Sequence, residues 1–359
     1  MESDTESPPS RLTARAPIFV TGCARSGTTL FTRLLDGHPD VLVFPIELKY
    51  FRYRAIRTDY PTVRLARLTD VRDVVRAIAE SDYVGPLRGA PDSIGGRDDA
   101  VAAIRNAIDT DRFREASRRL NGINTHADGI VHFFAALGES IGMDREDLAN
   151  VRFVEKSPYQ EENVDELISW FPDARFVHLV RNPYAVMVSE REGGVAQYMK
   201  IHAAAMQRSS LRRAIRNREV YGDRYQIVRY EDLVSRPETV MRDTVTALGL
   251  EDHSALREPT ILGQRWRGNS SSGQRFVGIS PSAADRWKAR IFEIEVGAVN
   301  RFLSAEMAHF HYERLATPPL TRVIAQAFRK DVRSGALNLY RSVRSGALNL
   351  YRYASGRRY

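Results

Sequence analysis

The sequence predicts an α/β fold of three layers, a central parallel sheet flanked by helices, together with a helical insertion. Short apolar runs alternate with segments of helical spacing, and this alternation favours a parallel sheet. The first apolar run, residues 18–21, leads through a glycine-containing loop into helical spacing over residues 28–35. Three further pairs of a strand and a following helix are predicted. The strand at residues 152–154 precedes a helix at 161–170, and the strand at 175–180 precedes a helix that begins near Tyr184. The strand at 226–228 precedes a helix that begins after Pro237.

The chain divides into three parts by its composition. Residues 1–16 are acidic and rich in Ser and Pro, so we expect them to be disordered. Residues 17–318 carry the alternating pattern and form the expected globular domain. Within it, residues 52–149 are mostly helical in pattern, with breaks at Gly85-Pro86 and Gly95-Gly96, which predicts an insertion that shapes a substrate cleft. Residues 319–359 form a basic C-terminal tail.

The composition excludes several classes of protein. Hydrophobic residues make up 43% of the chain, enough for one substantial core. Cys23 is the single cysteine, so neither an internal disulfide nor a cysteine-rich zinc cluster is available. No apolar run reaches about 18 residues, and the N-terminus lacks the basic and then apolar pattern of a signal peptide. A cytoplasmic location is therefore expected.

The net charge of +8 is concentrated in the tail. From Thr321 onward the chain has nine basic residues and one acidic residue, which account for the whole charge and leave the remainder neutral. A nucleic-acid partner is therefore not expected for the body of the protein. Residues 332–341 recur unchanged as residues 343–352, an eleven-residue repeat that keeps its helical phase. Its basic amphipathic pattern suits a helix in peripheral contact with an anionic membrane or with an acidic partner, and a recent duplication in a solvated tail is the alternative.

A phosphate loop is predicted at residues 22–29, Gly-Cys-Ala-Arg-Ser-Gly-Thr-Thr. Backbone N–H groups of such a loop, placed before a helix, point at an anion, so the expected fold is P-loop-like. The lysine of an ATP-binding loop is replaced by Thr28, and the strand over residues 175–180 ends in Arg181 where a magnesium-binding aspartate would stand. Arg25 supplies the cation within the loop, which favours an anion held without a metal. A turn that only caps a helix is the alternative.

A second cationic element is Arg181-Asn182-Pro183, with Ser189 eight residues after the arginine. Proline is favoured in the first turn of a helix, so Arg181 is expected at a strand end with Ser189 about two turns along the following helix. In isolation, Arg181 could equally be a surface arginine.

Together the two elements resemble the sulfotransferases that use 3'-phosphoadenosine 5'-phosphosulfate (PAPS), especially the branch of bacterial and tyrosylprotein enzymes. The likeness spans roughly residues 17–303. Further matching segments are Asp36-Gly37-His38-Pro39, Glu155-Lys156-Ser157-Pro158, Arg229-Tyr230-Glu231-Asp232-Leu233 and Arg286-Trp287. The resemblance implies that Arg25, Ser26, Gly27, Thr28 and Thr29 hold the 5'-phosphosulfate. It also implies that Arg181 and Ser189 hold the 3'-phosphate, and that Tyr230 and Arg286 contribute to donor binding.

The resemblance also implies the catalytic groups. Glu47, one residue later than the spacing of the tyrosylprotein branch, is the expected base, and Arg25 and Lys156 are expected to stabilise the transferred group without a metal. Sulfuryl transfer needs mainly positioning and charge stabilisation, and these groups could supply both. Alternatives are an ion pair of Glu47 with Lys49, and one of Lys156 with Glu155 or Glu161. His126 and His132 are rival bases, whereas His178 is expected in the core and Cys23 as a small filler.

The expected function is thus transfer of a sulfuryl group from PAPS to a hydroxyl acceptor by in-line displacement. The acceptor classes left open are a carbohydrate, a lipid-linked or small alcohol, and a tyrosine side chain. Two other functions remain as alternatives: a P-loop kinase or ATPase, and a non-catalytic nucleotide-binding protein at a membrane.

Overall fold

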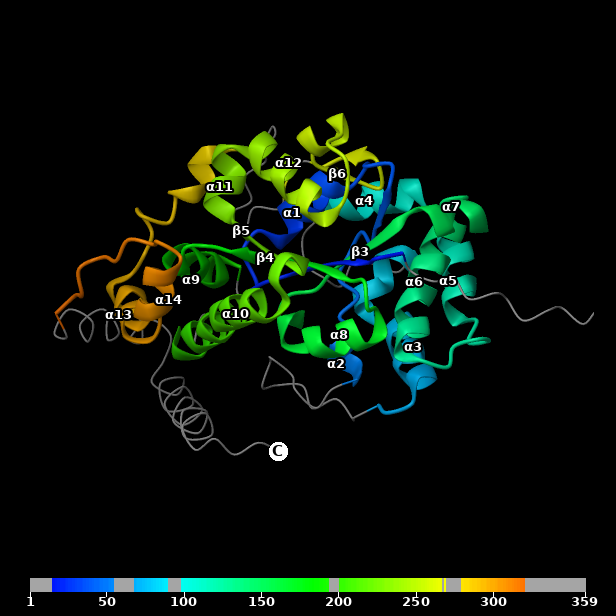
Figure 1. The fold of residues 1–359 in the computed structure, drawn as a ribbon, viewed down its shortest axis with the longest axis horizontal. Coiled ribbons are helices and arrows are strands. Elements are labelled where there is room, and N and C mark those ends of the chain that lie inside the picture. Colours follow the sequence, from blue (N-terminus) through cyan, green and yellow to red (C-terminus); the bar gives the residue numbers. More distant parts are fainter. Residues whose placement is uncertain are drawn as a thin grey trace, which may run out of the picture.

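A computed structural model describes residues 15–54, 68–89, 98–193, 200–266, 268 and 279–319 (Figure 1). The N-terminal residues 1–14, the tail repeat and the Gly95-Gly96 break lie outside the described residues. Gly85-Pro86 lies inside a 3₁₀ helix, η1 (Asp82–Arg88), so the chain changes helix type there.

The centre of the fold is a sheet of five parallel strands in the order β2-β3-β1-β4-β5. The strands are β1 (Ile18–Thr21), β2 (Val41–Val43), β3 (Arg152–Lys156), β4 (Arg175–Val180) and β5 (Tyr225–Arg229). The predicted parallel sheet is confirmed, but β2, a strand of three residues, was not predicted. A separate pair, β6 (Thr260–Ile261) and β7 (Gln264–Arg265), is antiparallel.

Helices cover both faces of the sheet, as predicted (Figure 1). On one face lie α1 (Thr28–Leu35), α11 (Tyr230–Ser235) and α12 (Pro237–Leu248), and on the other lie α8 (Val164–Trp170) and α10 (Lys200–Tyr221). Alternation along the strands sorts the side chains: Ile18 and Val20 pack with the first group, whereas Phe19 packs with the second. Because both faces are buried, the strands are almost entirely apolar.

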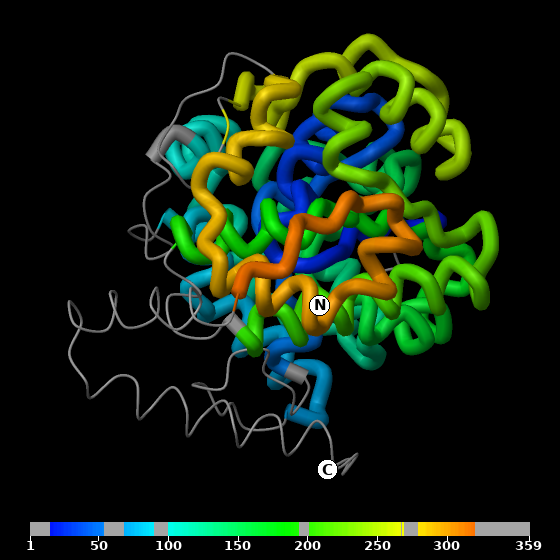
Figure 2. The backbone as a smooth tube through the Cα atoms, turned by 90° about the vertical axis from the view of Figure 1, so that its left-hand side faces the viewer, coloured from blue at the N-terminus to red at the C-terminus, as the bar shows by residue number. Residues whose placement is uncertain are grey.

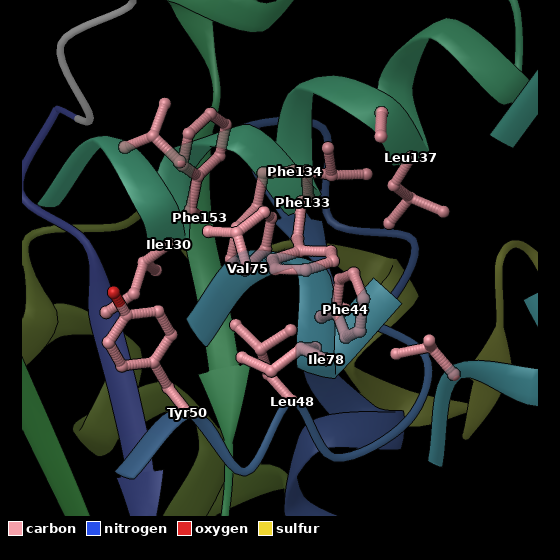
Figure 3. Close-up of a cluster of buried hydrophobic side chains, with 14 of the residues drawn as sticks. Phe44, Leu48, Tyr50, Val75, Ile78, Ile130, Phe133, Phe134, Leu137 and Phe153 are labelled. Atoms are coloured by element: carbon pink, nitrogen blue, oxygen red, sulfur yellow. The ribbon is translucent and has the colours of Figure 1, made fainter. Parts of the chain in front are cut away.

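The chain between β2 and β3 is helical. It contains α2 (Tyr50–Arg54), α3 (Val71–Glu80), α4 (Asp98–Ala107), α5 (Thr110–Arg118), α6 (His126–Ser140) and α7 (Arg145–Asn150). Its core packs on the sheet through aromatic rings: Phe134 stacks on Phe153 of β3 at 4.5 Å between centroids, and Phe44 meets Phe134 edge-on at 5.5 Å (Figure 3). The insertion therefore shares one core with the sheet.

Three further helices pack against α10. They are α9 (Pro183–Glu192), α13 (Glu293–Phe302) and α14 (Ser304–His309), and α13 contacts both α9 and α10. Trp287 stacks on Tyr184 with 5.2 Å between ring centroids. Figure 2 shows residues 279–319, the last described part of the chain and coloured gold to orange, on the outside of the molecule.

Short 3₁₀ helices connect several elements: η2 (Gln160–Asn163), η3 (Gly222–Arg224), η4 (Ser254–Arg257) and η5 (Pro281–Ala284). Within the described ranges, no helix is long and apolar enough to cross a membrane.

Candidate active site

The phosphate loop, residues 22–29, runs from the end of β1 into the first two residues of α1, in the strand–loop–helix order that was predicted. Its backbone enters the left-handed region at Gly22 (φ +137°), Arg25 (φ +68°) and Gly27 (φ +101°). A Cβ on Gly22 would lie 2.4 Å from the Leu179 carbonyl oxygen, and one on Gly27 would lie 2.4 Å from the Tyr230 ring. Both positions therefore require glycine, and the loop stays tight against β4 and Tyr230.

The loop contains a buried hydroxyl group that could donate a hydrogen bond to a ligand. Ser26 is 1% exposed, and its Oγ has no hydrogen-bond partner within the described part of the chain. A buried hydroxyl without a partner is costly, and a bound phosphate oxygen at this loop would satisfy it. The N-terminus of α1 follows directly, and its free N–H groups favour an anion at the same place.

Arg181 reaches the phosphate loop from the neighbouring strand. It follows the end of β4, and its Nη1 donates a hydrogen bond to the carbonyl oxygen of Arg25 at 2.9 Å. Its guanidinium lies 4.1 Å from the centroid of the Tyr230 ring, a cation–π contact. Its Nε is buried and has no partner among the described residues. The two cationic elements predicted from sequence thus meet at one edge of the sheet, with a donor group still available.

Ser189 and Arg25 lie at the carboxyl end of α9. Asn182 caps the helix by accepting the Tyr184 N–H at 3.0 Å, with Pro183 in its first turn, as the sequence indicated. The Ser189 carbonyl accepts the Gly193 N–H at 3.0 Å, and a Cβ on Gly193 would lie 2.0 Å from the Arg25 guanidinium. The guanidinium therefore rests against the helix end, where its positive charge is favourable. Ser189 itself is half-buried.

Arg286 completes the cationic surroundings of Tyr230. Burial lowers the pKa of the Arg286 guanidinium; Tyr230 opposes this shift, and the positive charges of Arg290 and Arg181 add to it. Charges that repel one another in this way mark a place where an anion would be stabilised.

The expected catalytic groups meet on the other side of the loop. Lys156, the last residue of β3, donates to Glu47 Oε1 at 2.6 Å, and its Nζ lies 3.4 Å from Thr29 Oγ1. Glu47 Oε2 is also paired with Lys49 at 3.0 Å, as the alternative interpretation expected. The partner of Lys156 is Glu47, not Glu155 or Glu161. Lys156 therefore joins the phosphate loop to the expected base.

Glu47 and Lys156 differ in the causes of their pKa shifts and in their exposure to solvent. Burial raises the pKa of the Glu47 carboxyl, but Lys156 and Lys49 outweigh burial and lower it to about 2. Burial lowers the pKa of the Lys156 ammonium, and Glu47 counteracts this shift. The Glu47 side chain is 27% exposed against 8% for Lys156, so Glu47 is the more accessible of the two.

A set of hydrogen bonds that holds the segment carrying Glu47 was not predicted from the sequence. The Ser157 hydroxyl donates a hydrogen bond to Glu155 Oε1 at 2.6 Å. The backbone N–H of Leu48 donates to the same Glu155 oxygen at 3.3 Å, and the backbone N–H of Lys49 donates to Ser157 Oγ at 2.9 Å. Burial raises the pKa of Glu155 to about 7, although these hydrogen bonds oppose the shift. The segment that carries Glu47 is thus tied to β3. The motif Glu155-Lys156-Ser157 was visible in the sequence, but its partner more than 100 residues earlier was not.

The histidines have structural contacts. His126 Nδ1 lies 2.9 Å from the Tyr50 hydroxyl, and His132 Nε2 lies 3.0 Å from the Ser117 carbonyl oxygen. Burial lowers the pKa of His132. His178 is fully buried in β4 against the Tyr225 hydroxyl, as expected for a core residue. Cys23 is 5% exposed, with its Sγ 3.2 Å from the Tyr159 hydroxyl. In the described ranges no cluster of three or more His, Cys, Asp or Glu residues could hold a metal ion.

Comparison with known proteins identifies the family. The model of the sulfotransferase family matches residues 17–254, which is more than half of the chain. The sulfotransferase domain of the Synechococcus PCC 7002 olefin synthase is similar in fold, with a TM-score of 0.51 and 22% identity, covering 86% of this chain and 98% of that domain. The sulfotransferase domain from the curacin biosynthetic pathway has a TM-score of 0.51 and 19% identity, covering 85% of this chain and 100% of that domain. No curated protein sequence matches the chain. With its phosphate loop and second cationic element in place, the chain belongs to the sulfotransferase family.

Proposed function

We propose that this sulfotransferase takes its sulfuryl group from PAPS and that Glu47 and Lys156 act on the acceptor and the transferred group. The observation that carries the proposal is the position of Lys156, which contacts both Thr29 of the phosphate loop and Glu47. One cation thus links the expected donor side to the expected base. Such an arrangement suits in-line transfer, in which positioning and charge stabilisation supply most of the catalysis.

The residues around the phosphate loop fit a donor with two separate phosphate positions. The Ser26 hydroxyl and the N-terminus of α1 would hold the 5'-phosphosulfate together with Arg25. The free Nε of Arg181 would bind the 3'-phosphate with Ser189. Tyr230 would hold Arg181 in place through its ring. PAPS would supply an activated sulfuryl group on a good leaving phosphate.

Glu47 would accept the proton of the acceptor hydroxyl as the new oxygen–sulfur bond forms. A carboxylate with a pKa of about 2 is a weak base, so the pair with Lys156 holds Glu47 in an inactive state. When Lys156 turns toward an anion at the phosphate loop, Glu47 loses its strongest counter-charge. Burial would then raise its pKa from about 2, with Lys49 alone opposing the shift. Base activity of Glu47 would thus depend on occupancy of the donor site.

The alternative of a P-loop kinase or ATPase has less support. Thr28 stands where such enzymes have their lysine, and Arg181 stands where a magnesium-binding aspartate would be. A non-catalytic nucleotide-binding protein would not need an accessible carboxylate beside a buried lysine. Among acceptor classes, a carbohydrate, a lipid-linked or small alcohol and a tyrosine side chain all offer the hydroxyl that Glu47 would deprotonate.

The test is transfer of label from isotopically labelled PAPS into a host-cell extract, followed by mass spectrometry for a sulfated product. We expect Glu47→Gln to retain binding of adenosine 3',5'-bisphosphate while its turnover falls about a hundredfold or more, the scale of lost general-base catalysis. The exposed Glu115 of α5, which forms an ion pair with Arg119, offers Glu115→Gln as a matched control with normal turnover.

Lys156→Met tests the cation in the same assay and should also lower turnover, whereas Lys288→Met on the surface should not. Normal turnover of Glu47→Gln with its true acceptor would overturn the role of Glu47. Magnesium-dependent ATP hydrolysis without sulfuryl transfer would overturn the function.

A further inference from the structure

The amino-terminal edge of the sheet, where all five strands begin, carries a row of arginines. Arg152 is the first residue of β3, Arg175 is the first of β4, and Arg224 directly precedes β5. Arg15 lies just before β1, the strand between β3 and β4. We call these four residues the arginine row. Because neighbouring strands lie about 4.8 Å apart, the row spans roughly 15 Å.

The arginine row lines a cavity of about 640 Å³. A cavity of this volume is within the usual range for small-molecule sites, about 300–1,000 Å³. The phosphate loop, Lys156 and Arg181 all lie at the opposite ends of the strands. The six residues of β4 alone separate Arg175 from Arg181 by roughly 20 Å. The cavity is therefore distinct from the candidate active site.

Arg152 provides an independent sign of a missing partner. It is 7% exposed, its Nε donates to the Ala16 carbonyl at 2.8 Å, and its Nη1 donates to the Leu248 carbonyl at 2.5 Å. Its Nη2 has no partner within the described residues. A buried guanidinium with one donor unsatisfied is unfavourable unless something else accepts the hydrogen bond.

The charge balance of the cavity favours an anion. Asp40 and Asp173 also line it, so four positive charges face two negative ones. None of the ion pairs formed among the described residues involves any of the four arginines. Burial lowers the pKa of Arg152 to about 10, and the charges of Arg175 and Arg15 lower it further while Asp40 opposes them. The arginines therefore repel one another without full compensation.

We propose that the cavity at the amino-terminal edge is a second anion site, which binds a small molecule carrying phosphate groups. Guanidinium groups bind phosphate through paired hydrogen bonds, and several spaced along the edge suit more than one phosphate group. Arg152 anchors the inner end of the site because its backbone contacts hold it in place. Arg175 and Arg224, which are half-buried, supply the charges that a ligand can reach.

Inorganic pyrophosphate is the probe. It is titrated by calorimetry into the full chain that has first been saturated with adenosine 3',5'-bisphosphate, so that the candidate active site is occupied. We expect one pyrophosphate per chain, with an affinity that falls as salt rises. Arg175→Gln and Arg224→Gln should each weaken pyrophosphate binding about tenfold, since each removes a charge-assisted contact, and leave bisphosphate binding unchanged. Arg76→Gln, an exposed arginine on α3, is the matched control with unaltered binding.

The outcomes separate the two sites. No heat of pyrophosphate binding in the bisphosphate-saturated protein at low salt would overturn the second site. So would pyrophosphate binding that Arg175→Gln leaves unchanged, or binding that excess bisphosphate abolishes, because the pyrophosphate would then occupy the phosphate loop. If the bisphosphate itself does not bind, the proposed function fails, while an affinity for pyrophosphate that depends on Arg175 still supports the second site.

Discussion

Glu190, on the buried side of α9, is expected to connect stability to donor binding through pH. It is 5% exposed, and burial raises its pKa to about 8, with the positive charge of Arg25 opposing the shift. Arg25 is the cation of the phosphate loop. The state of Glu190 therefore affects both the folded protein and the charge that a donor phosphate would meet.

The perturbation is Glu190→Gln, and its size follows from the pKa. An unfolded glutamate titrates near pH 4.5, so the folded state keeps a proton that the unfolded state has lost between about pH 4.5 and 8. Each pH unit in that interval costs about 1.4 kcal/mol, and the wild type thus loses up to about 5 kcal/mol on going from acid to above pH 8. The variant, which does not titrate, avoids this loss.

The assay is chemical denaturation of both proteins at about pH 5.5 and about pH 9. We expect the stability of Glu190→Gln relative to the wild type to increase by about 3 kcal/mol between these values. Glu155, whose pKa of about 7 lies in the same range, titrates in both proteins. Its contribution therefore cancels when the stability of the wild type is subtracted from that of the variant. Glu115→Gln, at an exposed glutamate, should track the wild type at both pH values.

Donor binding provides a second measurement. Above about pH 8 the ionised Glu190 competes for Arg25, so the affinity of the wild type for adenosine 3',5'-bisphosphate should decrease while that of Glu190→Gln stays level. A stability difference that is the same at both pH values would refute the reasoning from burial. An equal decrease of affinity in both proteins would refute the link to Arg25.

Three further outcomes are expected. Arg181→Ala should remove the preference for adenosine 3',5'-bisphosphate over AMP that we expect in the wild type, and equal affinity of the wild type for both nucleotides in calorimetry would contradict the assignment of Arg181. Gly27→Ala should greatly reduce bisphosphate binding, because its Cβ would lie 2.4 Å from the Tyr230 ring, and wild-type binding and melting temperature would show that the loop tolerates the methyl group. The hypothesis of membrane contact predicts that removal of residues from Thr321 onward abolishes sedimentation with anionic vesicles and spares nucleotide binding; absent sedimentation of the full chain at low salt would remove that hypothesis.

The features of this protein that depend on a few neighbouring residues could be predicted from the sequence. The apolar runs, the glycines of the phosphate loop and Asn182-Pro183 specify strand ends and helix starts over a few residues, because period and capping act locally. Four of the five strands in the main sheet and the parallel α/β class were predicted in this way. The candidate site residues could also be proposed from the sequence, since a loop with Arg25 and no lysine indicates an anion held differently from ATP.

Only the tertiary structure decided which of these residues meet. Lys156 contacts Glu47 because β3 lies between β2 and β1, although 109 residues separate the two side chains in sequence. Arg181 reaches the Arg25 carbonyl because β4 pairs with β1, across 156 residues. Alternation of strands and helices does not specify strand order, since every order buries the same apolar faces locally. The ion pair of Glu47 with Lys156, the hydrogen bonds that Glu155 makes with the Glu47 segment and the arginine row at the opposite edge all depend on that order, and so could not be predicted from the sequence.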